Sequence, residues 1–255
     1  MDMRADVWSP LQNSAVWLGA WLHGHEPADE LIDALTQLGG YPEAYGSAAF
    51  SDILARLRAA TDALLGQGTG EPVLRLVLSG PGEPPALPAG TTSAAAASAS
   101  PAGAIVVRTA DPSVHLVLVP HAGPNYTQWQ LIEETQPLPA PAWLSPGEAD
   151  ALLAQATEES ARIIEGLDYV TKDVPNPRLT VGALSDFYDT PGLPDATPPR
   201  AARLFARADR VAAIIETVTD RLQEHSLDPQ LLRLWRHIRQ ARMAGVAYAV
   251  ADFGR

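Results

Sequence analysis

Apolar residues recur every three to four positions through the first third of the chain, a spacing that predicts amphipathic helices. We expect helices over residues 11–22, 27–38 and 48–65. Pro27 suits the first turn of the second helix, where the N–H that proline lacks would have no partner. Gly39 and Gly40 follow that helix and are typical of a helix end.

The hydrophobic period then shortens to two. Four short runs rich in valine, leucine and isoleucine are each bounded by proline, glycine or aspartate, which is the pattern of an antiparallel meander. These predicted strands cover residues 73–79, 104–109, 114–119 and 126–133. Residues 80–103, between the first two strands, join a proline-rich stretch to an alanine/serine stretch and are predicted to form a flexible insertion.

Helical periodicity returns after the sheet. Ser145, Pro146 and Glu148 form a capping-box sequence that begins a helix extending to about residue 167. Two further helices, over residues 199–225 and 229–251, are separated by only a short connection and should form an antiparallel hairpin.

The expected fold class is α+β. It has an antiparallel four-stranded β-meander over about residues 73–133, helices before it, and the C-terminal hairpin packed on one sheet face. We expect a single domain over residues 1–255, with a helical part (1–70), a sheet part (71–136) and a second helical part (145–255) that contains a long loop (168–199).

Strand alternation assigns the side chains to two faces of the sheet, because residues opposite one another in a pair share a face. One face collects aliphatic residues such as Ile105, Val107, Leu116 and Leu118 and should be core. The other collects six polar side chains, which are Arg75, Arg108, His115, Tyr126, Gln128 and Gln130. This second face is either a half-solvated outer surface or a ligand platform, on which two guanidinium groups and an imidazole would hold a carboxylate or phosphate.

Charge is distributed unevenly. The chain carries a net charge of −12, which disfavours nucleic acid and anionic membrane as partners. Residues 200–255 nevertheless hold 10 basic and 6 acidic side chains. Four arginines of the first hairpin helix fall within about 80° of arc at 100° per residue; they are Arg200, Arg203, Arg207 and Arg210. They form either an interaction surface or ion pairs with acids of the same chain.

Motifs for the common enzyme classes are missing. The sequence has no cysteine, no glycine-rich phosphate loop, no dinucleotide-binding glycine pattern and no His-Glu-x-x-His motif, so no cofactor is predicted. His23, His25 and Glu26 lie close together but lack further ligands nearby, so no metal site is predicted. Because neither a secretory signal nor a long apolar run is evident, we expect a cytoplasmic protein.

Two hypotheses for the function follow. The leading one is a non-catalytic interaction or accessory module that binds a protein partner, or a second copy of itself, through its helical faces. The alternative is a binding protein or enzyme for a small anionic ligand, built on the polar sheet face and the loop 168–199. A cavity lined by Arg108, His115 and residues of 168–199 would favour the alternative, and a large apolar contact between chains would favour the first.

Overall fold

A computed structural model describes most of the chain, namely residues 10–46, 48–66, 70–80, 83–141, 144–166, 192–222 and 228–255. The helices are α2 (Pro10–Leu22), α3 (Ala28–Gly39), α4 (Phe50–Leu65), α5 (Thr92–Ala99), α6 (Pro146–Gly166), α8 (Pro199–Leu222) and α9 (Asp228–Phe253). The strands are β1 (Tyr41–Ala44), β2 (Leu74–Val77), β3 (Ala104–Arg108), β4 (His115–Ala122) and β5 (Tyr126–Glu134).

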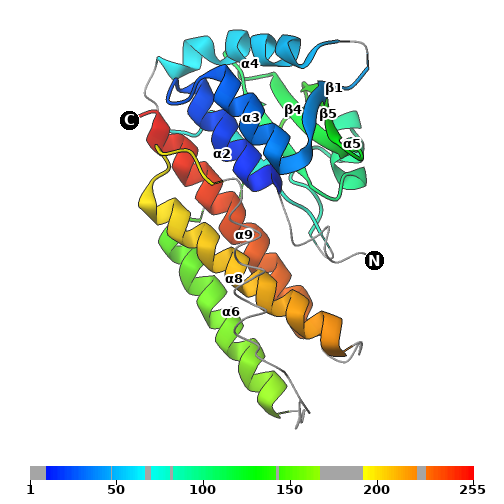
Figure 1. Ribbon diagram of the computed structural model, residues 1–255, viewed down its shortest axis with the longest axis vertical. Helices are drawn as coiled ribbons and strands as arrows, with labels where there is room; N and C mark the ends of the chain where they lie inside the picture. The colour runs from blue at the N-terminus through cyan, green and yellow to red at the C-terminus, as the bar shows by residue number, and fades with distance from the viewer. Residues whose placement is uncertain are drawn as a thin grey trace.

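Two lobes make up the molecule (Figure 1). The N-terminal lobe holds the sheet and helices α2 to α5. Helices α6, α8 and α9 form a bundle that extends away from this lobe, and α9 is long enough to belong to both. Its first half packs in the bundle, while its second half packs against α2 and β2.

The sheet has the order β1-β5-β4-β3-β2, and the four strands β2 to β5 form the predicted antiparallel meander. The prediction of a purely antiparallel, four-stranded sheet was wrong, because β1 adds a fifth strand parallel to β5. Tyr41 N–H donates to the Asn125 carbonyl at 3.0 Å, and Tyr45 N–H donates to the Trp129 carbonyl at 3.0 Å. A four-residue strand that contains Pro42 is too short to be recognised from its hydrophobic pattern, and proline is tolerated because β1 lies at the sheet edge.

Register confirms the predicted core face. Ile105 lies opposite Leu118 and Val107 lies opposite Leu116, and all four side chains are 2% exposed or less. Helices α2, α3 and α4 and the C-terminal half of α9 cover this face. The helices before the sheet therefore pack as expected, whereas only the end of the C-terminal hairpin reaches the sheet.

The second sheet face is covered in part by α5, so part of residues 80–103, the segment predicted to be a flexible insertion, is helical. Thr91 caps the helix, its side-chain oxygen accepting from Ala94 N–H at 3.3 Å, and Ala97 is fully buried against the sheet. Alanine is the best helix former, and its short side chain lets the helix lie close to the valines of β3 and β4. The alanine-rich composition of α5 therefore suits close packing on the sheet.

The bundle forms as the helical periodicity indicates, with α6 as a third member beside the hairpin. Ser145 and Glu148 make both capping-box hydrogen bonds, at 2.8 and 3.2 Å. Leu153, Leu204 and Ile238 meet in its core, each 2% exposed or less. Most of the predicted loop 168–199 lies outside the described residues.

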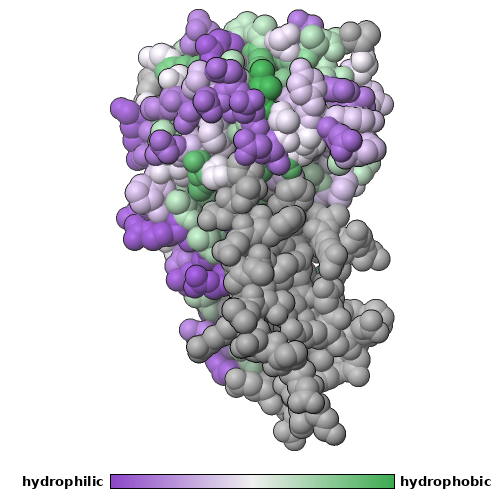
Figure 2. Space-filling view, viewed as in Figure 1, coloured by the Kyte–Doolittle hydropathy of each residue, from purple (hydrophilic) through white to green (hydrophobic). Residues whose placement is uncertain are grey.

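Hydrophilic and hydrophobic residues interleave over the visible face of the N-terminal lobe, without a large apolar patch on the coloured atoms (Figure 2). Among the described helices, none combines the length and the hydropathy needed to cross a bilayer.

Candidate functional site

Strand pairing brings three of the predicted polar residues together at one end of the second sheet face. Arg108 of β3 lies directly opposite His115 of β4, and Arg75 of β2 is on the same face next to them. All three line a cavity of about 360 Å³. The chain that follows β5, residues 137–141, forms the other wall with three prolines and Leu138. Residues 137–141 therefore cover the polar face in part here.

The other three predicted residues share the face but not the cavity. Gln128 lies opposite His121, and Gln130 Oε1 accepts a hydrogen bond from His121 Nε2 at 3.0 Å. Tyr126 lies against Gly123 in the β4–β5 turn. His121 is six residues along β4 from His115, about 20 Å at the rise of a strand. The six-residue platform predicted from sequence is thus two separate groups.

Two nitrogen atoms at the cavity are buried without a hydrogen-bond partner among the described residues: Nε of Arg75 and Nδ1 of His115. The contact from Arg75 Nη2 to the Ala86 carbonyl is long, at 3.5 Å. Arg108 differs, since its Nη1 forms an ion pair with Glu71 at 2.9 Å on the half-exposed rim. A buried polar atom left unpaired costs about 1–3 kcal/mol, so this arrangement favours an added acceptor.

The pKa shifts of His115 and Arg75 also favour a bound anion. Burial lowers the pKa of His115 below its ordinary value of 6.5, and the positive charges of Arg75 and Arg108 lower it further, while Glu134 acts in the opposite direction. Burial also lowers the pKa of the Arg75 guanidinium. A negative charge placed beside them would favour the protonated form of both groups and would raise both pKa values.

Glu134 is a residue that the sequence reasoning missed. It lies opposite His115 across β4–β5 and is only 4% exposed. Burial works to raise the pKa of its carboxyl, but hydrogen bonds outweigh this and lower it: Ser93 of α5 donates one, and Gln136 N–H donates another at 2.8 Å. The carboxylate stays ionised, and its oxygens are engaged by α5 and by the chain that leads to residues 137–141. Its position continues the alternation of Tyr126, Gln128 and Gln130, so extending the predicted strand by one residue would have found it.

The described residues that line the cavity include no serine, threonine, lysine or aspartate. The ionisable side chains among them are Arg75, Arg108, His115 and Glu71. Two guanidinium groups and one imidazole match the oxygens of a carboxylate or a phosphate.

The predicted arginine surface of α8 is partly used within the chain. Arg207 pairs with Asp150 of α6 at 2.8 Å, and Arg203 Nε donates to the Pro199 carbonyl at 3.2 Å. Arg200 and Arg210 are exposed. Binding of a protein partner or of a second copy stays a prediction.

The small residues of α9 also pack inside the molecule. Ala241 and Ala249 are fully buried, and Gly245 lies so close to the Phe205 ring that an added Cβ would be 2.4 Å from it. The histidines near residue 25 likewise contact the end of α9, since His25 Nε2 lies 2.9 Å from the Phe253 carbonyl oxygen. These features of the sequence therefore have structural roles.

Comparison with known proteins identifies relatives along most of the chain. A family model described as the N-terminal domain of the Rv1486c-like protein matches residues 12–143, and the model of its C-terminal domain matches residues 147–243. An uncharacterised protein of Mycobacterium tuberculosis strain CDC 1551 is 28% identical over 244 residues, which cover 82% of each chain. An uncharacterised protein of Mycobacterium leprae is 27% identical, over 94% of this chain and 97% of its own. No solved structure matches.

Proposed function

The chain belongs to the Rv1486c-like protein family, with matches to both domains of that family, and we propose that it binds a small anion in the cavity of its N-terminal domain. The cavity between Arg75, Arg108, His115 and residues 137–141 is called the cationic cavity from here on. The N-terminal family model ends at residue 143, just after residues 137–141 of the cavity lining. The C-terminal model begins at residue 147, at the start of α6.

A single observation carries this proposal: Arg75 Nε and His115 Nδ1 are buried at the cationic cavity without a partner in the described part of the chain. Buried polar groups in folded proteins are almost always hydrogen-bonded. A bound carboxylate or phosphate would compensate the positive charge, and a side-chain movement that exposes the two nitrogens to the cavity would let its oxygens accept from both. At about 360 Å³, the cavity has the size of a small-molecule site.

The rigidity of the cavity wall supports the proposal. Its floor is the paired part of β2, β3 and β4, where the backbone is held by the sheet ladder. Val106, at the centre of that floor, is 1% exposed. Ligand sites placed on such elements are held in position without a large ordering cost on binding.

Replacing Arg75 with methionine is expected to weaken anion binding by about ten- to hundredfold, as is typical when one partner of a shielded charge-assisted hydrogen bond is removed. Isothermal titration calorimetry or ligand-observed NMR with acetate, benzoate and inorganic phosphate would measure the affinity. Methionine keeps much of the length and apolar contact of the arginine stem, so the fold should be retained.

Arg203→Met provides the matched control, because Arg203 is an exposed arginine of α8 whose described hydrogen bond is to the Pro199 carbonyl. This variant should bind each anion as the unaltered protein does. If the two variants lose affinity equally, or if none of the three anions binds, the cationic cavity is not an anion site.

A further inference from the structure

A second cavity adjoins the cationic cavity and has a different character. It encloses about 130 Å³ between the edge strand β2 and helix α9. Arg75 and Pro141 line both cavities, so Arg75 separates a charged space from the neighbouring one. The second space is called the apolar cavity here because most of its lining is hydrophobic: Leu76, Leu78, Pro84, Leu144, Met243 and Ala247.

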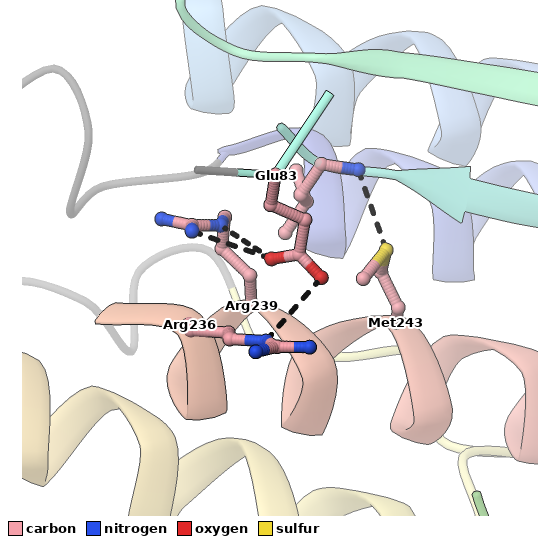
Figure 3. A network of polar contacts seen from close by, with 5 residues as sticks. Glu83, Arg236, Arg239 and Met243 are labelled. Atoms are coloured by element: carbon pink, nitrogen blue, oxygen red, sulfur yellow. Dashed lines mark hydrogen bonds and ion pairs between the residues drawn. The ribbon is translucent and has the colours of Figure 1, made fainter. Parts of the chain in front are cut away.

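Besides Arg75, the charged group in its described lining is Glu83, which is already neutralised. Glu83 forms ion pairs with Arg239 at 3.3 Å and with Arg236 at 3.9 Å (Figure 3). The backbone N–H of Leu78 donates to Met243 Sδ at 3.4 Å. Because these groups have partners within the chain, the apolar cavity offers hydrophobic contact rather than a second position for a charge.

Size and charge define the ligand that would fill both spaces. A dry cavity of about 150 Å³ accepts one benzene molecule, so the apolar cavity has room for a group near that size. Among the described lining residues of the cationic cavity, the formal charges are those of Arg75, Arg108 and Glu71, which sum to +1. His115 adds little charge at neutral pH because its pKa is lowered. A ligand with one negative charge therefore balances the charge of the cationic cavity better than a ligand with two.

We infer that the ligand class is a monocarboxylate with a short aryl or alkyl group. Its carboxylate contacts Arg75 and His115, and its apolar group passes Arg75 to lie between β2 and α9. This inference rests on the proposed function and narrows it to one chemical class. A planar carboxylate also matches the fork of the Arg75 guanidinium.

The test is a series of straight-chain carboxylates from acetate to octanoate, with phenylacetate added. Each methylene buried contributes about 0.8 kcal/mol, so affinity should rise about fourfold per methylene. The rise should level off once the apolar cavity is filled, at about four or five methylenes. For the short carboxylates, which should bind weakly, the affinity would be measured from NMR chemical-shift changes of the protein.

Ala247→Leu fills the apolar cavity from α9 and is expected to remove the dependence of affinity on chain length. Ala247 is half-buried, so the larger side chain extends into the cavity rather than into the close-packed core. Ala206→Leu, at an exposed position of α8, is the matched control and should keep the full dependence on chain length.

The outcomes separate the inference from the proposal beneath it. If acetate does not bind, and neither benzoate nor phosphate does, the proposed function fails. If acetate binds but affinity is the same from acetate to octanoate, the inference fails and anion binding stands. If the dependence on chain length survives in Ala247→Leu, the apolar group lies elsewhere and the inference is again overturned.

Discussion

Asp209→Ala is expected to lower the free energy of unfolding by about 3–5 kcal/mol, because it leaves the guanidinium of Arg242 buried beside the removed carboxylate. Arg242 Nη2 pairs with Asp209 Oδ1 at 2.7 Å, and the side chain of Arg242 is 3% exposed. The pair joins α8 to α9 near the middle of the bundle. Urea denaturation followed by circular dichroism would measure the loss.

Asp150→Ala is the control for this change. Asp150 also pairs with an arginine of α8, at 2.8 Å, but the two side chains are 40% and 47% exposed. Ion pairs in such positions contribute about 1 kcal/mol or less. Equal losses in the two variants would mean that burial of Arg242 does not set the strength of its pair with Asp209.

Gly40→Ala is expected to destabilise the N-terminal lobe by about 3 kcal/mol or more, since two separate costs combine. Gly40 adopts φ 80° and ψ 176°, a backbone conformation that is almost exclusive to glycine. In addition, a Cβ at this position would lie 2.4 Å from the backbone of Asn125, so β1 could not keep its place beside β5. Thermal unfolding and amide exchange in β1 would report the change.

Gly66→Ala tests whether the destabilisation by Gly40→Ala depends on the positive φ and close packing of Gly40. Gly66 also follows a helix, but it has φ −81° and no atom within 4 Å of an added Cβ. Its replacement should be neutral or should stabilise by up to about 1 kcal/mol, because alanine restricts the unfolded chain. A destabilisation by Gly66→Ala that matches that of Gly40→Ala would contradict the account.

The cavity residues could be predicted from the sequence because alternation fixes which side chains share a face. Arg108 and His115 flank a short turn, so their pairing follows from the two strands alone. The other residues of the predicted platform lie outside the cavity because β4 is longer than predicted. β4 continues to Ala122, three residues beyond the predicted end, and this carries Gln128 and Gln130 to the far end of the sheet.

Other features had no signal in the hydrophobic pattern. The strand β1 is formed by pairing with β5 and contains Pro42. The wall at 137–141 is a proline-rich segment whose place over Arg75 depends on the tertiary fold. The alanine-rich composition of α5 fits a helix as well as a linker. The buried hydrogen bond that Ser93 donates to Glu134 joins this helix to the sheet, and the hydrophobic pattern does not indicate it.

Acid sensitivity follows from the lowered pKa of His115. Below pH 6.5 the unfolded chain takes up a proton at this residue more readily than the folded protein does. The contribution of His115 to stability is therefore present above that pH and is lost as the pH falls through the lower value of the folded protein. A carboxylate beside the ring would favour its protonated form, so binding should raise the pKa and should strengthen as the pH falls.

Titration of the His115 ring by ¹H–¹⁵N NMR, with and without benzoate, tests the anion site most directly. The His115→Gln variant would assign the signal. We predict a pKa below 6.5 in the free protein and a clear upward shift when benzoate is bound. A ring that titrates at or above 6.5 in the free protein, and whose pKa stays unchanged with benzoate, acetate and phosphate, would contradict the site.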